Sequence, residues 1–214
     1  MVSKKQANEI IDEMTKLFPD AHCELNHANP FELTIAVLLS AQTTDKGVNN
    51  VTVDLFQKYK TPADYLAVPL SELENDLRRI GLFKTKAKNV KMLCQILIDD
   101  YNGEIPDNYD DLVRLPGVGR KTANVVLSVA FDVPRIAVDT HVDRISKRLK
   151  FARQKDSVLA VEERLMYLIP EEKWSKSHHV MIFFGRYHCT AKKPKCKECP
   201  LFDRCTSREK LQFL

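Results

Sequence analysis

A tight turn between two helices most constrains the fold of this chain, and it reads Leu115-Pro116-Gly117-Val118-Gly119-Arg120-Lys121. Two glycines flank one small apolar residue, so the backbone can bend sharply and point several N–H groups outward, which suits a phosphate. Apolar residues at helical spacing follow, so we expect a largely buried helix from Arg120 to Phe131. Because a short helix from Tyr109 to Arg114 is expected before the turn, the segment predicts a helix-hairpin-helix unit.

Lys121 falls in the first turn of the helix that follows the glycines. The helix dipole and nearby apolar surface both disfavour a positive charge there, so we expect the amine to lose its proton readily and to be a nucleophile. Taken alone, a lysine at this position fits a solvated or phosphate-contacting role better than a catalytic one.

Asp139 is a carboxylate that can return to this lysine. The helix advances the chain by roughly 17 Å at about 1.5 Å per residue, whereas the connection from Asp132 to Val138 can span roughly 23 Å at about 3.3 Å per residue. Asp139 also precedes a new helix as its N-cap. Capping and catalysis are therefore both open for this residue.

The composition is that of a globular protein rather than a disordered one, with 214 residues of which 44% are hydrophobic and 29% charged. A formal net charge of +4 has the right sign for a nucleic-acid partner but does not establish one. The N-terminus lacks the apolar core of a signal peptide, and no run approaches membrane length. We therefore expect a cytoplasmic chain that does not enter a membrane.

Helical periodicity extends over most of the chain. No segment between Ala21 and Asp132 alternates as a strand does, so this part is expected to form about six packed helices, with a boundary near Pro134. Downstream helices are expected at 140–149, 157–169 and 174–187. Cap-forming residues place further helix starts at Thr43 or Thr44, at a capping box from Ser71 to Glu74, and at Asp107.

Two loops between the expected helices carry candidate ligand contacts. Gln42 falls at a junction between helices rather than on an exposed face, where it either satisfies buried backbone groups or contacts a ligand. Leu82 and Phe83 form a short loop, and such residues either pack inward or act as a wedge between bases. Basic residues gather around this second loop, which fits a solvated helix face or a DNA-backbone role: Arg78, Arg79, Lys84, Lys86, Lys88 and Lys91.

Four cysteines in a short segment predict a metal site: Cys189, Cys196, Cys199 and Cys205. Zinc accepts four cysteines but usually as two paired knuckles. A single C-x2-C pair with unequal outer spacings suits the asymmetric wrapping of a [4Fe–4S] cluster, which spacing alone favours only modestly. Disulfides are not expected in a reducing compartment, and the isolated Cys23 and Cys94 are expected in the core.

In combination, these motifs closely resemble the endonuclease III family of helix-hairpin-helix DNA glycosylases. The resemblance rests on Leu115 to Ala123, Val138-Asp139-Thr140-His141-Val142, Leu39-Ser40-Ala41-Gln42-Thr43-Thr44-Asp45 and the cysteine segment. It covers essentially the whole chain, with no departure at a motif position.

The resemblance implies a two-lobed all-α fold. A six-helix barrel with the helix-hairpin-helix would cover residues 22–132, and residues 1–21 with 133–214 would form a cluster domain, with its cysteine box at 189–205. Double-stranded DNA with a damaged base or an abasic site would bind a monomer in the groove between the lobes, so the chain would be associated with the nucleoid.

Residue roles also follow from the resemblance. Lys121 would be the nucleophile and Asp139 its essential carboxylate, and the four cysteines would hold a structural [4Fe–4S] cluster. Gln42 would fill the space of the flipped nucleotide, Leu82 would wedge at the opposite strand, and His141 would lie at the lesion pocket. Further DNA contacts are implied for Gly117, Val118, Gly119, Arg120, Lys84, and Lys193 in the basic loop from Lys192 to Lys197.

The implied activity is that of a bifunctional DNA glycosylase and AP lyase of base excision repair. It removes oxidised pyrimidines such as thymine glycol and cleaves 3′ to the abasic site by β-elimination through a lysine imine. An adenine-type monofunctional glycosylase is the nearest alternative, but that family typically lacks a lysine at position 121 and has a carboxylate near Leu39-Ser40-Ala41-Gln42. A non-catalytic DNA-binding protein or redox sensor with an iron–sulfur cluster would need neither Lys121 nor Asp139.

Overall fold

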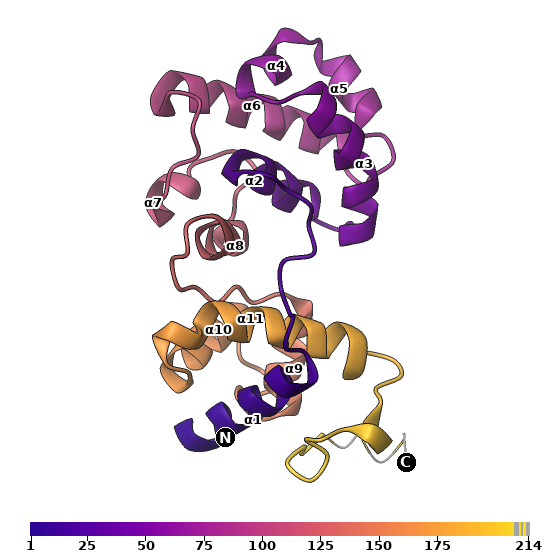
Figure 1. The fold of residues 1–214 in the computed structure, drawn as a ribbon, viewed down its shortest axis with the longest axis vertical. Coiled ribbons are helices and arrows are strands. Elements are labelled where there is room, and N and C mark those ends of the chain that lie inside the picture. Colours follow the sequence, from indigo (N-terminus) through magenta and orange to yellow (C-terminus); the bar gives the residue numbers. More distant parts are fainter. Residues whose placement is uncertain (208–209, 211, 213–214) are drawn as a thin grey trace. The chain divides into compact units, whose positions relative to one another are not determined.

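The computed structural model describes residues 1–207, 210 and 212, and all regular structure in this part of the chain is helical (Figure 1). The all-α prediction is therefore confirmed. The chain divides into two compact units, which we term the middle unit (Cys23–Asp132) and the terminal unit (Met1–His22 with Val133–Leu214). Within the described residues, no helix is both long enough and apolar enough to cross a membrane.

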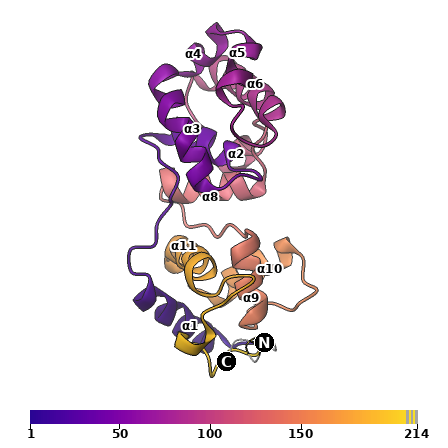
Figure 2. The same cartoon turned by 90° about the vertical axis from the view of Figure 1, so that its right-hand side faces the viewer.

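The middle unit contains α2 (Pro30–Leu39), α3 (Asp45–Lys58), α4 (Pro62–Ala67), α5 (Leu70–Asp76), α6 (Phe83–Tyr101), α7 (Tyr109–Leu112) and α8 (Arg120–Ala130). Helix α2 is buried from Phe31 to Leu39 apart from Glu32, and a helix that is apolar on all sides needs neighbours around it. Helices α3, α6 and α8 pack against it. Figure 2 shows α4 and α5 beside α6, against which both pack, and α7 packs on α8.

The observed N-cap residues of the middle unit agree only in part with the predicted ones. Thr44 caps α3, because its side chain accepts a hydrogen bond from Gly47 N (3.2 Å). The predicted capping box at Ser71 is wrong: the N-cap of α5 is Pro69, two residues earlier, so Ser71 already lies inside the helix. Asp107 is also wrong by one residue, since Asn108 caps α7. Asn and Asp cap helices about equally well, and the sequence alone does not choose between such neighbours.

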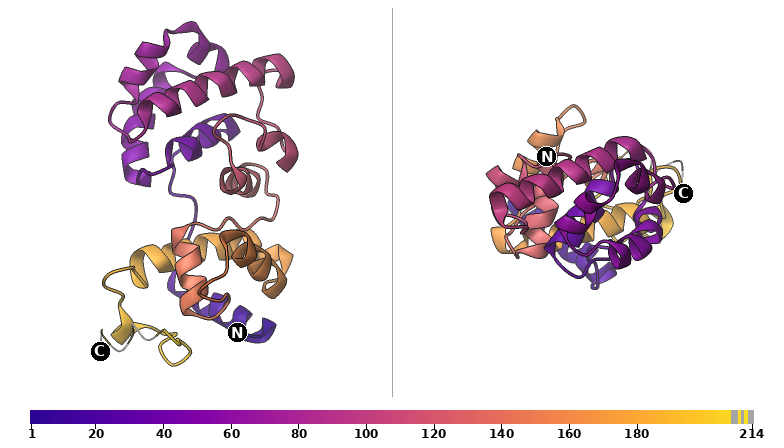
Figure 3. Two further views of the ribbon diagram at one scale, coloured as in Figure 1. Left: turned by 180° about the vertical axis from the view of Figure 1, so that it is seen from behind. Right: turned by 90° about the horizontal axis from the view of Figure 1, so that it is seen from above.

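The terminal unit contains α1 (Lys4–Leu17), α9 (Thr140–Arg148), α10 (Val158–Leu168), η1 (Glu171–Lys173), α11 (Trp174–Phe183), η2 (Phe184–His188) and η3 (Cys196–Glu198). Helix α1 packs against α10 and α11, and α11 packs against α9. In Figure 3 (left) the indigo N-terminal helix lies beside the orange helices of the C-terminal part. Their shared core includes Ile10, Met14, Ile145, Leu165 and Phe184.

Candidate active site and cysteine pocket

The turn before α8 is closed by Val118 N–H, which donates to Leu115 O (3.0 Å). Gly117 has φ +81° in the left-handed region, and a Cβ there would lie 2.8 Å from Leu38 Cδ1. Both the backbone conformation and the packing on α2 therefore require glycine at this position. Gly119 is extended (φ −93°, ψ 179°), and its Cβ position faces open space. Of the two glycines predicted to bend the chain, only Gly117 does so.

The first N–H groups of α8 have no side-chain cap, because the N-cap residue, Gly119, has no side chain that could accept a hydrogen bond from them. A helix start of this kind is an anion site. Arg120 is exposed, with its guanidinium 5.7 Å from the centre of the Tyr109 ring on α7. Lys121 follows in the first helical turn, as predicted, and its side chain is exposed. The apolar surroundings expected for Lys121 are therefore wrong for the chain without DNA.

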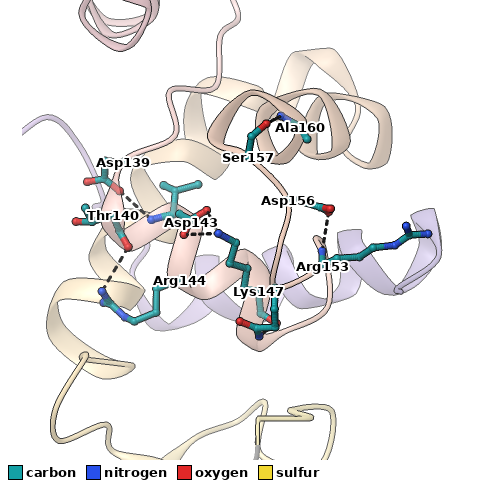
Figure 4. Close-up of polar contacts among 11 residues, drawn as sticks. Asp139, Thr140, Asp143, Arg144, Lys147, Arg153, Asp156, Ser157 and Ala160 are labelled. Atoms are coloured by element: carbon teal, nitrogen blue, oxygen red, sulfur yellow. Dashed lines mark hydrogen bonds and ion pairs between the residues drawn. The ribbon is translucent and has the colours of Figure 1, made fainter.

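Asp139 begins α9 in the terminal unit, and its capping role is confirmed. Its Oδ1 atom accepts hydrogen bonds from His141 N and Val142 N, both at 2.8 Å. Figure 4 shows this carboxylate at the start of α9. Because both cap bonds go to one oxygen, the cap fixes the orientation of the carboxylate and does not use its second oxygen.

His141 is half-buried in the first turn of α9, next to Arg144. Arg144 Nη2 lies 3.2 Å from His141 Nδ1 and donates to Gly185 O (2.7 Å). Burial lowers the pKa of His141, and although Asp139 acts in the opposite direction, Arg144 and Arg186 lower it further. The surroundings of His141 therefore favour the neutral form of its ring.

Gln42 and Leu82 lie in two loops of the middle unit, and both have a left-handed backbone, with φ +56° and +58°. The expectation that Gln42 avoids an exposed face is wrong, because its side chain is exposed. Leu82 does not pack inward either, since it is 53% exposed. A left-handed conformation is costly for side chains such as these, so the surrounding structure must hold both loops in place.

The basic residues predicted to gather near Leu82 do not form one surface. Lys84 and Lys88 are exposed, as are Arg78 and Arg79 beyond α5. Lys91 Nζ instead donates to Leu66 O (3.4 Å) and to Val68 O at the end of α4. Lys86 is buried. Only part of the predicted cluster is therefore available to a DNA backbone.

The four cysteines of the terminal unit line one pocket, together with Leu149, Phe184, His188, Pro194, Lys195, Phe202 and Lys210. All four are free thiols. Burial raises the pKa of the Cys189 thiol, and it raises that of Cys199 to about 11. In the described part of the chain, no three potential ligand side chains are grouped as they would be around a single metal ion.

The chain reaches this pocket through a π-helical turn, η2, where a regular end of the 174–187 helix was predicted. Cys189 N donates to Phe184 O (2.7 Å) across the wider turn. A Cβ on Gly185 would lie 2.9 Å from His141 Cβ, so glycine allows this turn to approach α9 closely. Local π turns of this kind are frequent at functional sites.

The donor set suits a [4Fe–4S] cluster. Four thiols border one partly apolar pocket, and the raised pKa values of Cys189 and Cys199 mean that a cationic centre would favour their thiolate forms. Arg148 Nη1 lies 3.3 Å from Cys189 Sγ and supports the same negative charge. Cys189, Cys196, Cys199 and Cys205 would hold the cluster, which would tie the segment 189–205 to the terminal unit.

Residues 35–171 match the family model described as HhH-GPD superfamily base excision DNA repair protein. Residues 189–205, which hold the four cysteines, match the model described as iron-sulfur binding domain of endonuclease III. The fold, the glycine turn and the cysteine pocket thus define a helix-hairpin-helix DNA repair protein with an iron–sulfur cluster.

Known proteins are similar over nearly the full length. Endonuclease III of Bacillus subtilis (strain 168) is 60% identical over 210 residues, which are 98% of this chain and 96% of the relative. Endonuclease III of Escherichia coli (strain K12) is 44% identical over 212 residues, 99% of this chain and 100% of the relative. The solved structure of a trapped endonuclease III–DNA covalent intermediate, an estranged-adenine complex, has a TM-score of 0.95 at 63% identity and 99% coverage of both chains.

The chain belongs to the endonuclease III family, and it is accordingly a DNA glycosylase and AP lyase of base excision repair. The iron–sulfur prediction is confirmed over zinc. The same matches favour this activity over the adenine-type and non-catalytic alternatives.

Sequence reasoning missed two arginines of α9. Arg144 donates to Gly185 O within η2, and Arg148 donates to Thr190 O beyond it. Their spacing of four residues places both on one face of α9. That spacing was a usable signal, but it does not identify carbonyls more than 40 residues away as the acceptors.

Proposed function

We propose that Lys121 is the nucleophile of this enzyme and Asp139 its carboxylate. The observation that carries the proposal is an exposed lysine in the first turn of α8, directly after a helix start with a glycine N-cap. The bare N–H groups suit a phosphate of the strand, so the same turn would hold the backbone while the lysine meets the sugar. Gly117, Val118, Gly119 and Arg120 are the proposed phosphate-binding segment.

The proposed reaction starts from a nucleotide extruded from the duplex, because C1′ is unreachable within stacked DNA. The neutral Lys121 amine attacks C1′, the C1′–N bond breaks, and the base leaves with the electron pair and takes up a proton. Asp139 accepts the proton that the amine loses and stabilises positive charge on the sugar. Opening of the sugar ring then gives an imine between Lys121 Nζ and C1′.

The imine acidifies the C2′–H bond. Loss of that proton and breakage of the C3′–O bond release the strand on the 3′ side, which keeps the phosphate at its 5′ end. Water then hydrolyses the remaining imine and frees the lysine. One amine therefore accounts for both base removal and strand cleavage. Lys121 belongs to the middle unit and Asp139 to the terminal unit.

The proposed partner is double-stranded DNA with an oxidised pyrimidine, such as thymine glycol, or an abasic site. Gln42 would fill the space of the extruded nucleotide, Leu82 would wedge at the opposite strand, and His141 would line the lesion pocket. Lys84 and Lys193, both exposed, would contact the backbone. A location at the nucleoid, with which the net charge of +4 agrees, and a monomeric state belong to the same proposal.

The experiment is borohydride trapping on oligonucleotides that each carry one lesion. The wild-type chain should form a covalent adduct with an abasic site and with thymine glycol, and Lys121→Gln should abolish both adducts. The exposed Lys60→Gln, a matched loss of one positive charge, should trap normally. An adduct that survives Lys121→Gln would identify another nucleophile and overturn the proposal.

A further inference from the structure

The loop that contains Gln42 and the loop that contains Gly81 and Leu82 approach each other in the middle unit. The carbonyl oxygen of Gln42 is 3.7 Å from the position that a Cβ would take on Gly81, the residue before Leu82. The placement of Gln42 relative to Leu82 therefore depends on what holds these two loops together.

Lys86 hydrogen-bonds to both loops. Its backbone N–H donates to Leu82 O (3.0 Å), and its Nζ donates to Thr43 Oγ1 (3.0 Å). The Thr43 hydroxyl in turn donates to Ala41 O (3.5 Å). Because Ala41 and Thr43 are the chain neighbours of Gln42, this series of hydrogen bonds holds Gln42 from both sides.

The position of Lys86 is unfavourable for an ammonium group. The residue is 3% exposed and lies in the first turn of α6, where the helix dipole opposes a positive charge. Its partner is a hydroxyl rather than a carboxylate, and burial lowers its pKa. An apolar side chain of similar length would fill the same space at lower cost. The presence of a lysine at this position therefore indicates a role other than stability.

We propose that Lys86 is a positioning residue that holds the Gln42 and Leu82 loops in the arrangement needed to keep a nucleotide out of the DNA duplex. The inference rests on the proposed roles of Gln42 and Leu82. Since Lys86 is buried, it acts through these loops. It is therefore needed when a base must leave a stacked duplex, and it is not needed when Lys121 attacks a sugar that is already unpaired.

The test compares two substrates for Lys86→Met, which keeps the length of the side chain and removes its donor. Excision of thymine glycol from duplex DNA should fall by about tenfold to a hundredfold, the usual effect of misplacing groups around a reacting centre. Borohydride trapping on a single-stranded abasic oligonucleotide should stay within about twofold of the wild type, and the melting temperature should be unchanged or higher. Lys60→Met, at an exposed lysine of the same unit, should leave all three measurements near wild type.

Variants at the partner residue sharpen the test. Thr43→Ser keeps the hydroxyl and should retain duplex excision, whereas Thr43→Val should reduce it. The double variant Lys86→Met/Thr43→Val should be no slower than the Thr43→Val variant, because the Lys86–Thr43 hydrogen bond is already lost in that single variant. Undiminished duplex excision by Lys86→Met would overturn the proposal, as would equal loss of both reactions with a lower melting temperature. Failure of the proposed function would appear separately, as no trapping by the wild type.

Discussion

Arg148 donates a hydrogen bond from Nη1 to the Sγ atom of Cys189 at 3.3 Å. The same guanidinium donates to Thr190 O (2.8 Å) and to Ala191 O (3.3 Å), and the residue is only 8% exposed. A single side chain at the end of α9 therefore organises the start of the cysteine segment. Hydrogen bonds from a charged donor are the stronger kind.

We expect Arg148→Met to lower the free energy of unfolding by about 2 kcal/mol, because it removes the hydrogen bonds that a charged donor makes to Thr190 O and Ala191 O. The iron content per chain should fall as well, since the segment that holds the first cysteine loses its support. Urea unfolding and the ratio of visible to ultraviolet absorption measure the two effects. Arg153→Met, at an exposed position after α9, is the control, and equal behaviour of the two variants would contradict this role for Arg148.

Asp139→Asn separates the two roles of the N-cap carboxylate. Asparagine caps a helix about as well as aspartate, so the stability of the terminal unit should change by less than about 0.5 kcal/mol. Base excision should nevertheless fall by about a hundredfold or more, because the amide cannot accept the proton. Single-turnover excision and DNA binding measured by anisotropy make the comparison. Near-normal turnover would leave Asp139 with its capping role alone.

Gly117→Ala and Gly119→Ala should behave differently although both lie in one turn. The first substitution forces a Cβ into a left-handed conformation and to within 2.8 Å of Leu38 Cδ1, so it should destabilise the middle unit by about 2 kcal/mol. The second meets open space and should cost about 1 kcal/mol or less as a poorer N-cap, while weakening DNA binding by covering the helix start. Thermal unfolding and binding titrations distinguish the two effects.

His179 makes the terminal unit sensitive to mild acid. Burial first, and then His178, His22 and Lys176, lower its pKa to about 3 in the folded chain. Below the ordinary histidine value near 6.5 the unfolded state therefore binds a proton that the folded state does not, so stability falls as the pH falls towards 3. Unfolding between pH 6.5 and 5 should show this slope, at most about 1.4 kcal/mol per pH unit. His179→Gln should flatten it, whereas His27→Gln, at an exposed histidine, should not.

Local chemistry was enough to predict some parts of the site. Thr44 and Asp139 were recognisable as caps because a cap depends on a few neighbouring residues. Arg148 and Lys86 were not, because their roles depend on acceptors far along the chain, at Thr190 and Thr43. Periodicity places a basic residue on a helix, and only the packed structure decides whether it meets water, a carbonyl or a hydroxyl.

The salt dependence of DNA binding should identify which lysines contact phosphates. Removing one phosphate contact lowers the slope of log K against log salt by about 0.9. Lys84→Met and Lys193→Met remove exposed charges in different units and should each produce that change. Lys91→Met should leave the slope unchanged and lower stability instead, because its ammonium donates to the carbonyls of Leu66 and Val68. Anisotropy titrations at several salt concentrations measure the slope, and an unchanged slope for Lys84→Met would place that side chain away from the DNA backbone.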